Sequence, residues 1–310
     1  MEKIKVLSVN ISVKKGIIKT PVASVILNED GTKGDAHSGP WNRQVSLLGI
    51  ESIKKFENQA GRKINYGEFA ENITTEGMEL FQTKPLDRFI IGDLILEVTQ
   101  IGKECHGDSC AIFKEVGNCV MPKEGIFCRV IQEGNLKAGD VLDYQPKIFK
   151  IKIITLSDRA SKRIYEDKSG PRLKSLIEDY FKKMSWKFEI HSHIIPDDPV
   201  QLNNILKLAG KEKSDLIFTT GGTGIGPKDL TPDVVKPMLD KEIPGIMEMI
   251  RVKYGMEKPN ALISRAVAGI MGNTLVFTLP GSVKAVNEYL TEILKGLKHL
   301  VYMLHGLDMH

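Results

Sequence analysis

The chain has 310 residues, of which 42% are hydrophobic and 26% charged, with a formal net charge of +4. This composition is typical of a globular protein, and the length predicts about two domains. The basic residues are scattered and not interleaved with aromatics, which argues against a nucleic-acid partner, and no apolar run is long enough to predict a membrane span. The N-terminus lacks a signal-peptide cleavage site, so we expect a cytoplasmic protein.

The first half consists of short β-like runs punctuated by glycine. Strands are expected at Lys5–Ser12, Ser24–Leu27, Phe89–Thr99 and Gly125–Ile131. One helix is expected over Gly49–Gln59 and a shorter one over Gly67–Glu71. Many short strands with turn signals predict a β-rich barrel or sandwich.

The second half alternates strands and helices after a boundary near Asp143–Lys147, which predicts domains over 1–146 and 147–310. Strands are expected at 149–155, 186–195, 214–219 and 273–279, and helices at 170–183, 199–210, 231–239, 244–254 and from Ser282 onward. This order predicts an α/β domain with a doubly wound, mostly parallel sheet, which binds ligands at the carboxyl ends of its strands.

The most informative segment is Thr219–Val235, with the sequence TTGGTGIGPKDLTPDVV. It follows a buried strand and leads into a helix near Thr231, the arrangement that presents backbone N–H groups to a phosphate. Its glycines permit positive φ angles and close approach of a ligand. The segment therefore predicts a phosphate site on the backbone of Gly221, Gly222, Thr223 and Gly224.

Carboxylates cluster at the same predicted sheet edge. Asp229 belongs to the glycine-rich part of Thr219–Val235, which we term the glycine loop. Asp158 follows the first strand of this domain, and Asp197 and Asp198 follow the second. Carboxylates beside phosphate-binding amides repel a phosphate unless a cation intervenes, so these residues predict a Mg²⁺–nucleotide complex with Asp229 as the metal ligand. Asp198 could instead only start a helix, and Ser282 could only cap one.

These motifs resemble the molybdopterin-binding domain of the MogA/MoaB/gephyrin type over about residues 148–310. The matching segments are Ser157-Asp-Arg-Ala-Ser161, Asp167-Lys-Ser-Gly-Pro171, Thr220-Gly-Gly-Thr-Gly224, Asp229-Leu-Thr-Pro232 and Leu279-Pro-Gly-Ser282. The resemblance implies transfer of AMP from Mg-ATP to molybdopterin. It places Asp229, Asp197 and Asp198 in catalysis, and it places Ser157, Asp158, Thr231, Pro280, Gly281 and Ser282 with the glycine loop in binding. Lys228 departs from the arginine that the family often has.

The four cysteines, Cys105, Cys110, Cys119 and Cys128, lack the paired spacing of a zinc ribbon, and without an export signal they are expected to be reduced thiols. Cys105 lies beside Lys103 and His106, which favours a thiolate, and Cys110 is the second candidate. The segments Gly34-Asp-Ala-His-Ser-Gly39, Arg43-Gln-Val-Ser46, Glu71–Gly77 and the Cys105 segment resemble the MOSC domain over about residues 1–146. That resemblance implies a sulfur-carrying or metal-contacting role for Cys105, or a cofactor-binding module without chemistry of its own.

The sequence therefore predicts a protein of molybdenum cofactor biosynthesis whose C-terminal domain is a molybdopterin adenylyltransferase. The MOSC domain would bind, carry or modify the cofactor, with molybdenum or a persulfide as its cargo. Two alternatives stay open, a non-catalytic cofactor carrier or scaffold and a CinA-like nucleotide pyrophosphatase. The family resemblance also implies a homo-oligomer, in particular a trimer, and other biosynthetic proteins are possible partners.

Overall fold

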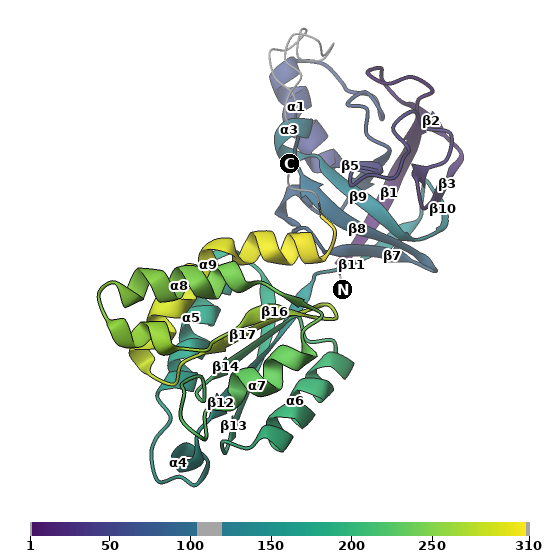
Figure 1. The fold of residues 1–310 in the computed structure, drawn as a ribbon. Helices are drawn as coiled ribbons and strands as arrows, with labels where there is room; N and C mark the ends of the chain where they lie inside the picture. Colours follow the sequence, from purple (N-terminus) through teal and green to yellow (C-terminus); the bar gives the residue numbers. More distant parts are fainter. Residues whose placement is uncertain (1, 104–119, 308–310) are drawn as a thin grey trace. The chain divides into compact units, whose positions relative to one another are not determined.

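The computed structural model describes residues 2–103 and 120–307. The chain divides into two compact units, Met1–Lys147 and Ile148–His310, and the division falls one residue after the boundary expected from the sequence. Figure 1 shows a first unit built mainly of strands and a second in which helices cover a sheet.

Within the described residues of the first unit, seven strands close into a barrel. Their order is β11, β7, β8, β9, β5, β6 and β1, and pairing of β1 with β11 completes the ring. All neighbours are antiparallel except β5 and β6, which are parallel. The barrel strands are β1 (Glu2–Ile11), β5 (Val45–Gly49), β6 (Ile73–Glu76), β7 (Arg88–Ile91), β8 (Leu94–Ile101), β9 (Ile126–Gln132) and β11 (Val141–Gln145).

Smaller elements surround this barrel. Strand β2 (Thr20–Val22) pairs with β1, while β3 (Ser24–Asn28), β4 (Gly31–Thr32) and β10 (Gly134–Lys137) form a separate sheet. Among the described residues of this unit, the helices are α1 (Ile50–Ala60), α3 (Met121–Glu124) and a 3₁₀ turn at Leu80–Gln82. In β1, Ile4, Val6 and Val9 are all buried, because a register shift between Val6 and Ser8 resets the inward alternation.

Two expectations for this unit are wrong in detail. The run Phe89–Thr99 is two strands, since Gly92 adopts a positive φ of 53° and turns the chain between β7 and β8. Residues 67–69 lie in a turn, and 70 and 71 have no regular structure, so the expected short helix is absent there; Gly67 (φ 83°) and Ala70 (φ 63°) are left-handed. A helix cannot continue through such residues.

The second unit is built on a six-stranded sheet, in the order β13, β12, β14, β17, β16, β15. The first four strands are parallel, and β16 and β15 add an antiparallel edge that the sequence reading missed. The strands are β12 (Ile148–Leu156), β13 (Lys187–Ile195), β14 (Leu216–Thr220), β15 (Lys241–Glu242), β16 (Ala268–Met271) and β17 (Thr274–Leu279).

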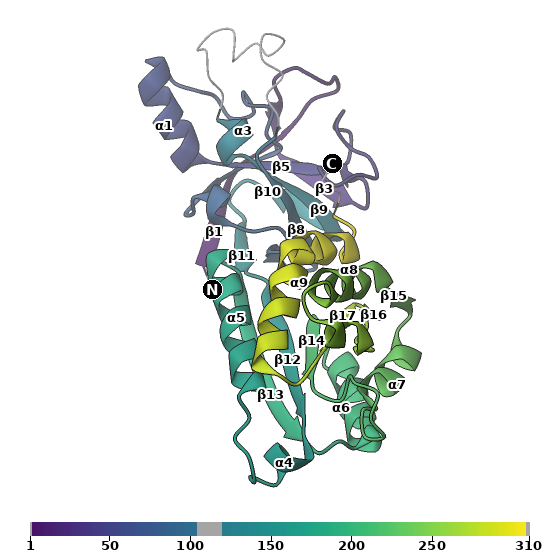
Figure 2. The same ribbon diagram turned by 60° about the vertical axis from the view of Figure 1, so that its left-hand side comes forward.

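Helices pack on both faces of this sheet (Figure 1 and Figure 2). On one face Ile154 and Ile217 pack with Leu202 of α6 and Val235 of α7. On the other face Phe149 contacts Phe181 of α5, and α5 lies against α9. The helices are α4 (Asp158–Ser161), α5 (Ser169–Lys183), α6 (Pro199–Lys211), α7 (Thr231–Val235), α8 (Pro244–Gly255) and α9 (Val283–Leu304), with 3₁₀ turns at Lys236–Met238 and Pro259–Ile263.

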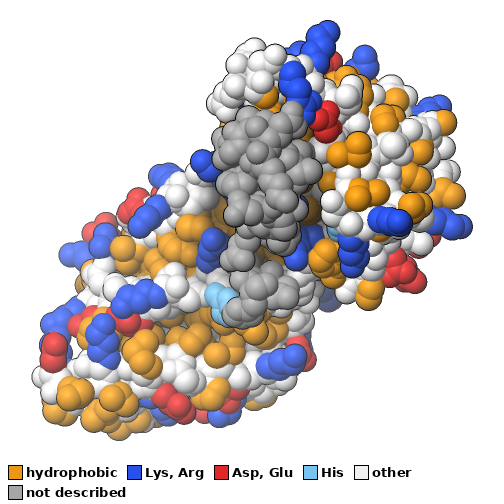
Figure 3. All heavy atoms as spheres, turned by 90° about the horizontal axis from the view of Figure 1, so that it is seen from above, with side chains coloured by type: hydrophobic (Ala, Val, Ile, Leu, Met, Phe, Trp, Pro, Cys, Tyr) orange, Lys and Arg blue, Asp and Glu red, His pale blue; other side chains and the backbone are white. Residues whose placement is uncertain are grey.

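The described surface seen in Figure 3 mixes lysine, arginine, acidic and apolar side chains, without a continuous stripe of one charge. Among the described residues, the helices are all too short or too polar to cross a membrane.

Candidate functional site

A pocket of about 1080 Å³ lies at the carboxyl end of the parallel strands in the second unit. It is lined by the loops that follow β12, β13, β14 and β17, together with the first turns of α5 and α9. Parallel strands deliver their carboxyl ends to one edge, which is where this class of sheet binds ligands. Of the residues singled out from the sequence, the pocket is lined by Ser157, Asp158, Asp197, Gly221, Gly222, Thr223, Gly224, Asp229, Pro280, Gly281 and Ser282.

The glycine loop has a backbone that only glycine accepts. Gly221 and Gly222 adopt φ angles of 105° and 64°. A Cβ on Gly221 would lie 2.2 Å from the carbonyl oxygen of Leu156, and one on Gly222 would lie 2.5 Å from Oγ1 of Thr231. Among the described residues, the N–H groups of Gly222, Thr223 and Gly224 donate to no protein acceptor. They are therefore available to a phosphate.

Thr231 supports this loop from beneath and does not line the pocket. Its side chain is fully buried and donates to the carbonyl of Gly221 at 2.9 Å, while its N–H donates to the carbonyl of Gly222 at 3.0 Å. Thr231 therefore positions the loop that lines the pocket, and the binding role expected of it stays a prediction.

Asp229 closes the far side of the loop. Its Oδ2 accepts the N–H of Gly226 at 2.9 Å, and its own N–H donates to the carbonyl of Gly226 at 3.0 Å. The carboxylate faces Gly224, where an added Cβ would lie 2.7 Å from Oδ2. The carboxylate of Asp229 thus holds the shape of the glycine loop and also lines the pocket, beside the N–H groups of the loop.

Arg265, which the sequence reading missed, ties the two ends of the loop together. Its Nε donates to the carbonyl of Gly224 at 2.8 Å, and its Nη2 donates to the carbonyl of Asp229. The same guanidinium forms a fork with Asp233 at 2.8 and 2.9 Å and lowers the pKa of that carboxyl. Arg265 lies some 40 residues along the chain, before β16, in no recognisable motif.

Asp158 and Asp197 hold two loops together by reciprocal contacts. The N–H of Asp158 donates to Oδ2 of Asp197 at 3.0 Å, and the N–H of Asp197 donates to Oδ1 of Asp158 at 3.2 Å. Lys228 donates to the remaining oxygen of Asp158, which lowers the pKa of Asp158 and raises that of Lys228. Lys228 thereby supplies a counter-charge to this acidic corner.

Asp198 lies outside the pocket and caps α6. Its Oδ1 accepts the N–H groups of Val200 at 2.8 Å and Gln201 at 3.3 Å. Asp198 therefore starts a helix, which was the alternative considered from the sequence. The adjacent Asp197 is the residue of the two that lines the pocket.

Both serines singled out from the sequence are helix caps at the pocket edge. Ser157 accepts the N–H of Ala160 at 3.2 Å, and Ser282 accepts the N–H of Ala285 at 3.2 Å. A Cβ on Gly281 would lie 3.2 Å from Cα of Gly221, and the hydroxyl of Thr220 donates to the carbonyl of Pro280 at 3.0 Å. The start of α9 is therefore packed directly against the glycine loop.

Four further basic residues line other parts of the same pocket, and the first two lie within segments that carry the family resemblance. They are Arg159, Lys168, Lys258 and Lys284. Lys258 lowers the pKa of the neighbouring Lys284 through their close approach. With Lys228, these four residues make five basic side chains in the lining, which also carries five acidic ones, Asp158, Asp167, Asp197, Asp229 and Glu288. A phosphate ligand is therefore favoured by the free N–H groups of the glycine loop and not by a net positive charge.

No three His, Cys, Asp or Glu side chains gather in metal-binding position within the described residues. Magnesium commonly keeps several waters and takes only one or two carboxylates plus substrate phosphates. Asp229 and the Asp158–Asp197 corner suit that mode of binding, and they do not suit a cage made by the protein alone.

The thiols expected to be reactive, Cys105 and Cys110, lie outside the described residues, as does Cys119. Cys128 on β9 is fully buried, and burial raises its pKa well above the usual value. It is therefore an inert thiol of the barrel core.

Comparison with known proteins assigns both units. The family described as MOSC domain matches residues 34–143, and the family described as probable molybdopterin binding domain matches residues 152–299. A molybdopterin adenylyltransferase of Helicobacter pylori is 32% identical over 50% of this chain and 88% of that protein.

Two further relatives match the same half. Molybdenum cofactor biosynthesis protein B of Staphylococcus aureus is 37% identical over 50% of this chain and 91% of that protein. Gephyrin of Dictyostelium discoideum is 36% identical over 50% of this chain, but the match spans only 22% of gephyrin. The chain thus belongs to the MogA/MoaB/gephyrin family of molybdopterin-binding proteins, with a MOSC domain preceding the molybdopterin-binding domain.

Proposed function

We propose that the second unit transfers AMP from Mg-ATP to molybdopterin. The observation that carries this proposal is the meeting, in one pocket, of free N–H groups on the glycine loop, the carboxylate of Asp229, and the Asp158–Lys228 pair. Transfer to a phosphate requires positioning of two anionic reactants and neutralisation of their charge, and these groups can do both.

The size of the pocket supports a two-substrate reaction. Its volume of about 1080 Å³ lies just above the range of about 300–1,000 Å³ that is typical of sites for one drug-sized ligand. The N–H groups of Gly222–Gly224 would hold one phosphate group. Lys258, just before the 3₁₀ turn at Pro259–Ile263, and Lys284, at the start of α9, would attract the second anion.

A magnesium ion would neutralise charge on the reacting phosphates when bound. Asp229 is the residue we assign to it, with Asp158 and Asp197 as the second acidic corner. Asp229 would also hold the glycine loop in shape through Gly226, so its charge and its hydrogen bond have separable roles.

The deciding experiment is AMP transfer to molybdopterin by the purified chain and by Asp229→Asn. Asparagine keeps an oxygen that can accept the N–H of Gly226, so the loop should persist. We expect transfer to fall at least about 100-fold, as for loss of other groups that stabilise developing charge. ATP binding without magnesium should not weaken, because a negative charge has been removed.

Asp240→Asn is the matched control. Asp240 also closes a turn, by accepting the N–H of Gly272 at 2.6 Å, but it is not a lining residue of the pocket. Its substitution should leave transfer unchanged. Wild-type protein that binds molybdopterin without consuming ATP would instead identify a carrier, and hydrolysis of dinucleotides without transfer would identify a pyrophosphatase.

For the MOSC domain we propose binding and handling of the same cofactor, with Cys105 as the thiol that carries sulfur or contacts the metal. The test is incubation with a low-molecular-weight persulfide, whose outer sulfur passes to the protein thiolate while its own thiolate leaves. The wild type and Cys110→Ser should then carry a persulfide that Cys105→Ser lacks. A persulfide present in all three proteins would remove this role from Cys105.

The trimer implied by the family resemblance is likewise a proposal, and sedimentation of the purified chain measures it. A monomer at assay concentration would contradict it.

A further inference from the structure

A second, smaller pocket lies in the first unit, remote in sequence from the glycine loop. Its volume is about 120 Å³, and His37, Trp41, Arg43, Ser46, Asn72 and Lys103 supply its polar and aromatic lining. The remaining described lining residues are apolar or alanine, and none is acidic. A cavity lined by basic groups and by no described carboxylate attracts an anion.

The two permanent charges of this pocket have no carboxylate partner among the described residues. Arg43 lies over the ring of Trp41, with its guanidinium carbon 5.0 Å from the ring centroid. This stacking fixes the plane of the guanidinium while leaving its N–H groups available. Lys103 lines the same cavity, and its flexible ammonium can follow a ligand that the guanidinium orients.

The nearest buried carboxylates do not cancel this charge. Asp35 is already neutralised by Lys19, and both side chains are almost completely buried. Although burial opposes it, hydrogen bonds from His37 and Lys19 keep the pKa of Asp35 low. Glu71 is fully buried as well, and burial raises its pKa, which favours its neutral form.

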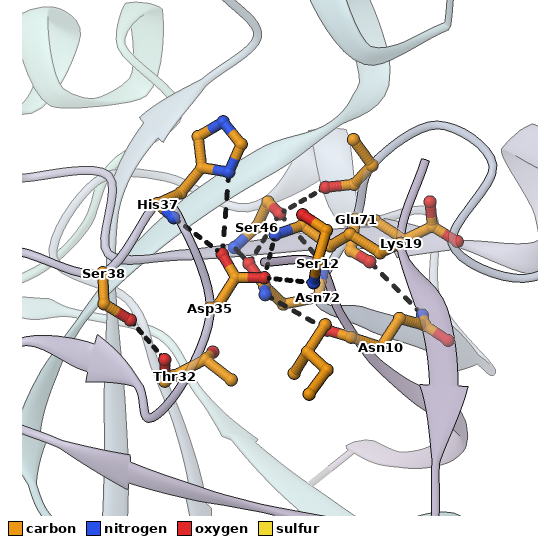
Figure 4. A network of polar contacts seen from close by, with 12 residues as sticks. Asn10, Ser12, Lys19, Thr32, Asp35, His37, Ser38, Ser46, Glu71 and Asn72 are labelled. Atoms are coloured by element: carbon orange, nitrogen blue, oxygen red, sulfur yellow. Dashed lines mark hydrogen bonds and ion pairs between the residues drawn. The ribbon is translucent and has the colours of Figure 1, made fainter. Parts of the chain in front are cut away.

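The same network holds the pocket wall rigid (Figure 4). Asp35 accepts the N–H of Ser12 at 3.0 Å and that of His37 at 2.9 Å, and Nδ1 of His37 lies 3.6 Å from Oδ1 of Asp35. Asp35 thus fixes the loop that carries His37 into the pocket. A rigid wall lowers the entropy that a ligand must offset on binding.

Ser46 and Asn72, which also line the pocket, are equally well held. The N–H of Ser46 donates to Oδ1 of Asn72 at 3.1 Å, its hydroxyl donates to the same oxygen at 3.0 Å, and the N–H of Asn72 donates to the carbonyl of Ser46 at 2.8 Å. Asn72 also donates to the carbonyl of Asn10 at 3.3 Å. These two side chains join β5 to the start of β6.

We propose that this pocket is a binding site for a tetrahedral oxyanion, held by Arg43 and Lys103 with His37 beside them, an inference that rests on the cofactor binding proposed for the MOSC domain. The volume excludes a drug-sized organic ligand, which needs about 300 Å³ or more, but admits a group of a few heavy atoms. The anion is either a free ion such as phosphate or molybdate, or the terminal phosphate of a larger molecule that extends out of the pocket.

The sequence offers a local reporter for this test. The chain has two tryptophans, Trp41 in the pocket and Trp186 in the second unit, where Trp186 is buried among aromatic rings. In a Trp186→Phe background the fluorescence of the full chain reports on the Trp41 pocket alone. Binding of phosphate at the glycine loop then does not contribute to the signal.

The experiment titrates this protein with molybdate, with inorganic phosphate and with glycerol 3-phosphate, at constant ionic strength set by chloride. We expect a saturable change in Trp41 fluorescence, and a dissociation constant at least tenfold higher in Arg43→Gln. Lys103→Gln should raise it by a smaller factor. Arg62→Gln, which removes an arginine paired with Glu68 outside the pocket, should leave it within twofold.

The three ligands separate the possible sources of the anion. Tightest binding of molybdate or phosphate identifies a free ion, and tightest binding of the ester identifies the end of a larger molecule. A fluorescence change that chloride reproduces, or a dissociation constant unaffected by Arg43→Gln in a variant with wild-type circular dichroism, overturns the proposal. Loss of transfer activity in the second unit has no bearing on this result.

Discussion

Each unit contains an aspartate–lysine ion pair, and the two pairs differ chiefly in burial. In Asp35–Lys19 the side chains are 0% and 1% exposed, whereas in Asp158–Lys228 they are 31% and 74% exposed. A buried pair must stay matched, because removing one partner leaves an isolated charge in a poor solvent. An exposed pair contributes little to folding, since water can replace either partner. The first pair therefore belongs to the scaffold and the second can serve a ligand.

The largest expected effect is the loss of stability that follows replacement of Lys19. Lys19→Met leaves Asp35 buried without its ammonium partner, and breaking a buried pair in this way costs about 3–5 kcal/mol of unfolding free energy. Urea unfolding followed by Trp41 fluorescence in the Trp186→Phe background measures it for the first unit.

Lys55→Met is the matched control, because Lys55 pairs with Glu79 on the surface of the same unit, where their side chains are 52% and 34% exposed. It should barely move the urea midpoint. Equal midpoints for the Lys19 and Lys55 variants would mean that burial does not separate the two kinds of pair.

The next effect concerns the glycine loop of the second unit. Gly221→Ala combines a positive φ of 105° with a Cβ that would lie 2.2 Å from a backbone carbonyl oxygen. We expect a loss of at least about 1–3 kcal/mol in unfolding free energy, as for residues forced into sparsely populated backbone conformations. AMP transfer should be abolished with it, because the loop N–H groups move.

Gly272→Ala separates the effect of backbone strain at a positive φ from the effect of a steric clash of the added Cβ. Gly272 also has a positive φ, 60°, but its added Cβ would meet nothing within 4 Å. It should lose stability without losing transfer. An equal loss of transfer in both variants would show that the shape of the glycine loop is not what activity depends on.

The sequence was sufficient where function depends on local backbone chemistry. The glycine spacing around Gly221 and the cap at Ser282, from which the last helix was expected to start, lie within a few residues of what they determine. Even there it could not choose between Asp197 and Asp198. Both carboxylates follow the same strand, and only the direction of each side chain sends one to the pocket and the other to the start of α6.

The sequence was insufficient where partners meet across the sheet. Arg265 reaches Gly224 and Asp229 because β16 adds an antiparallel edge beside β17, an element too short to stand out from its flanks. Pairing of β1 with β11 closes the barrel by joining strands from the two ends of the first unit's sequence. No local sequence pattern indicates that contact either. Hydrophobic periodicity identifies a strand but does not name its neighbour.

A third ion-pair group, at Glu292, lies between the two extremes. Its side chain is 4% exposed, while its partners Lys253 and Lys295 are 48% and 63% exposed. They lower the pKa of Glu292 to about 2 from an ordinary value of 4.5. A lowered carboxyl pKa stabilises the fold above the ordinary value, and this stabilisation disappears as the pH falls towards 2.

Glu292→Gln should therefore be less stable than the wild type at pH 7, and the difference should shrink between about pH 4.5 and pH 2. Thermal midpoints of the two proteins across this range measure the gap. The difference between the two midpoints isolates Glu292, because the other carboxylates titrate equally in the wild type and the variant. A gap that stays constant with pH would assign the effect of the substitution to packing and not to charge.

The smallest effect on stability is expected from Lys228→Met. Lys228 and Asp158 are exposed, so their separation should leave the unfolding midpoint almost unchanged. Its effect on function should be distinct, because the ammonium sits on an oxygen of Asp158, where a divalent cation would compete with it. Without the lysine, Mg²⁺ should bind this corner more readily, and half-maximal AMP transfer should require less magnesium.

Lys236→Met provides the control, since Lys236 pairs with Glu242 at 3.1 Å outside the pocket. It should leave the magnesium dependence unchanged. Lys228→Arg tests the opposite direction, because a guanidinium can bind a carboxylate through two N–H groups and compete more strongly with the metal. If the Lys228→Met and Lys228→Arg variants shift the magnesium requirement in the same direction, Lys228 acts on the substrate phosphates, and the exposed pair is not a competitor for the cation.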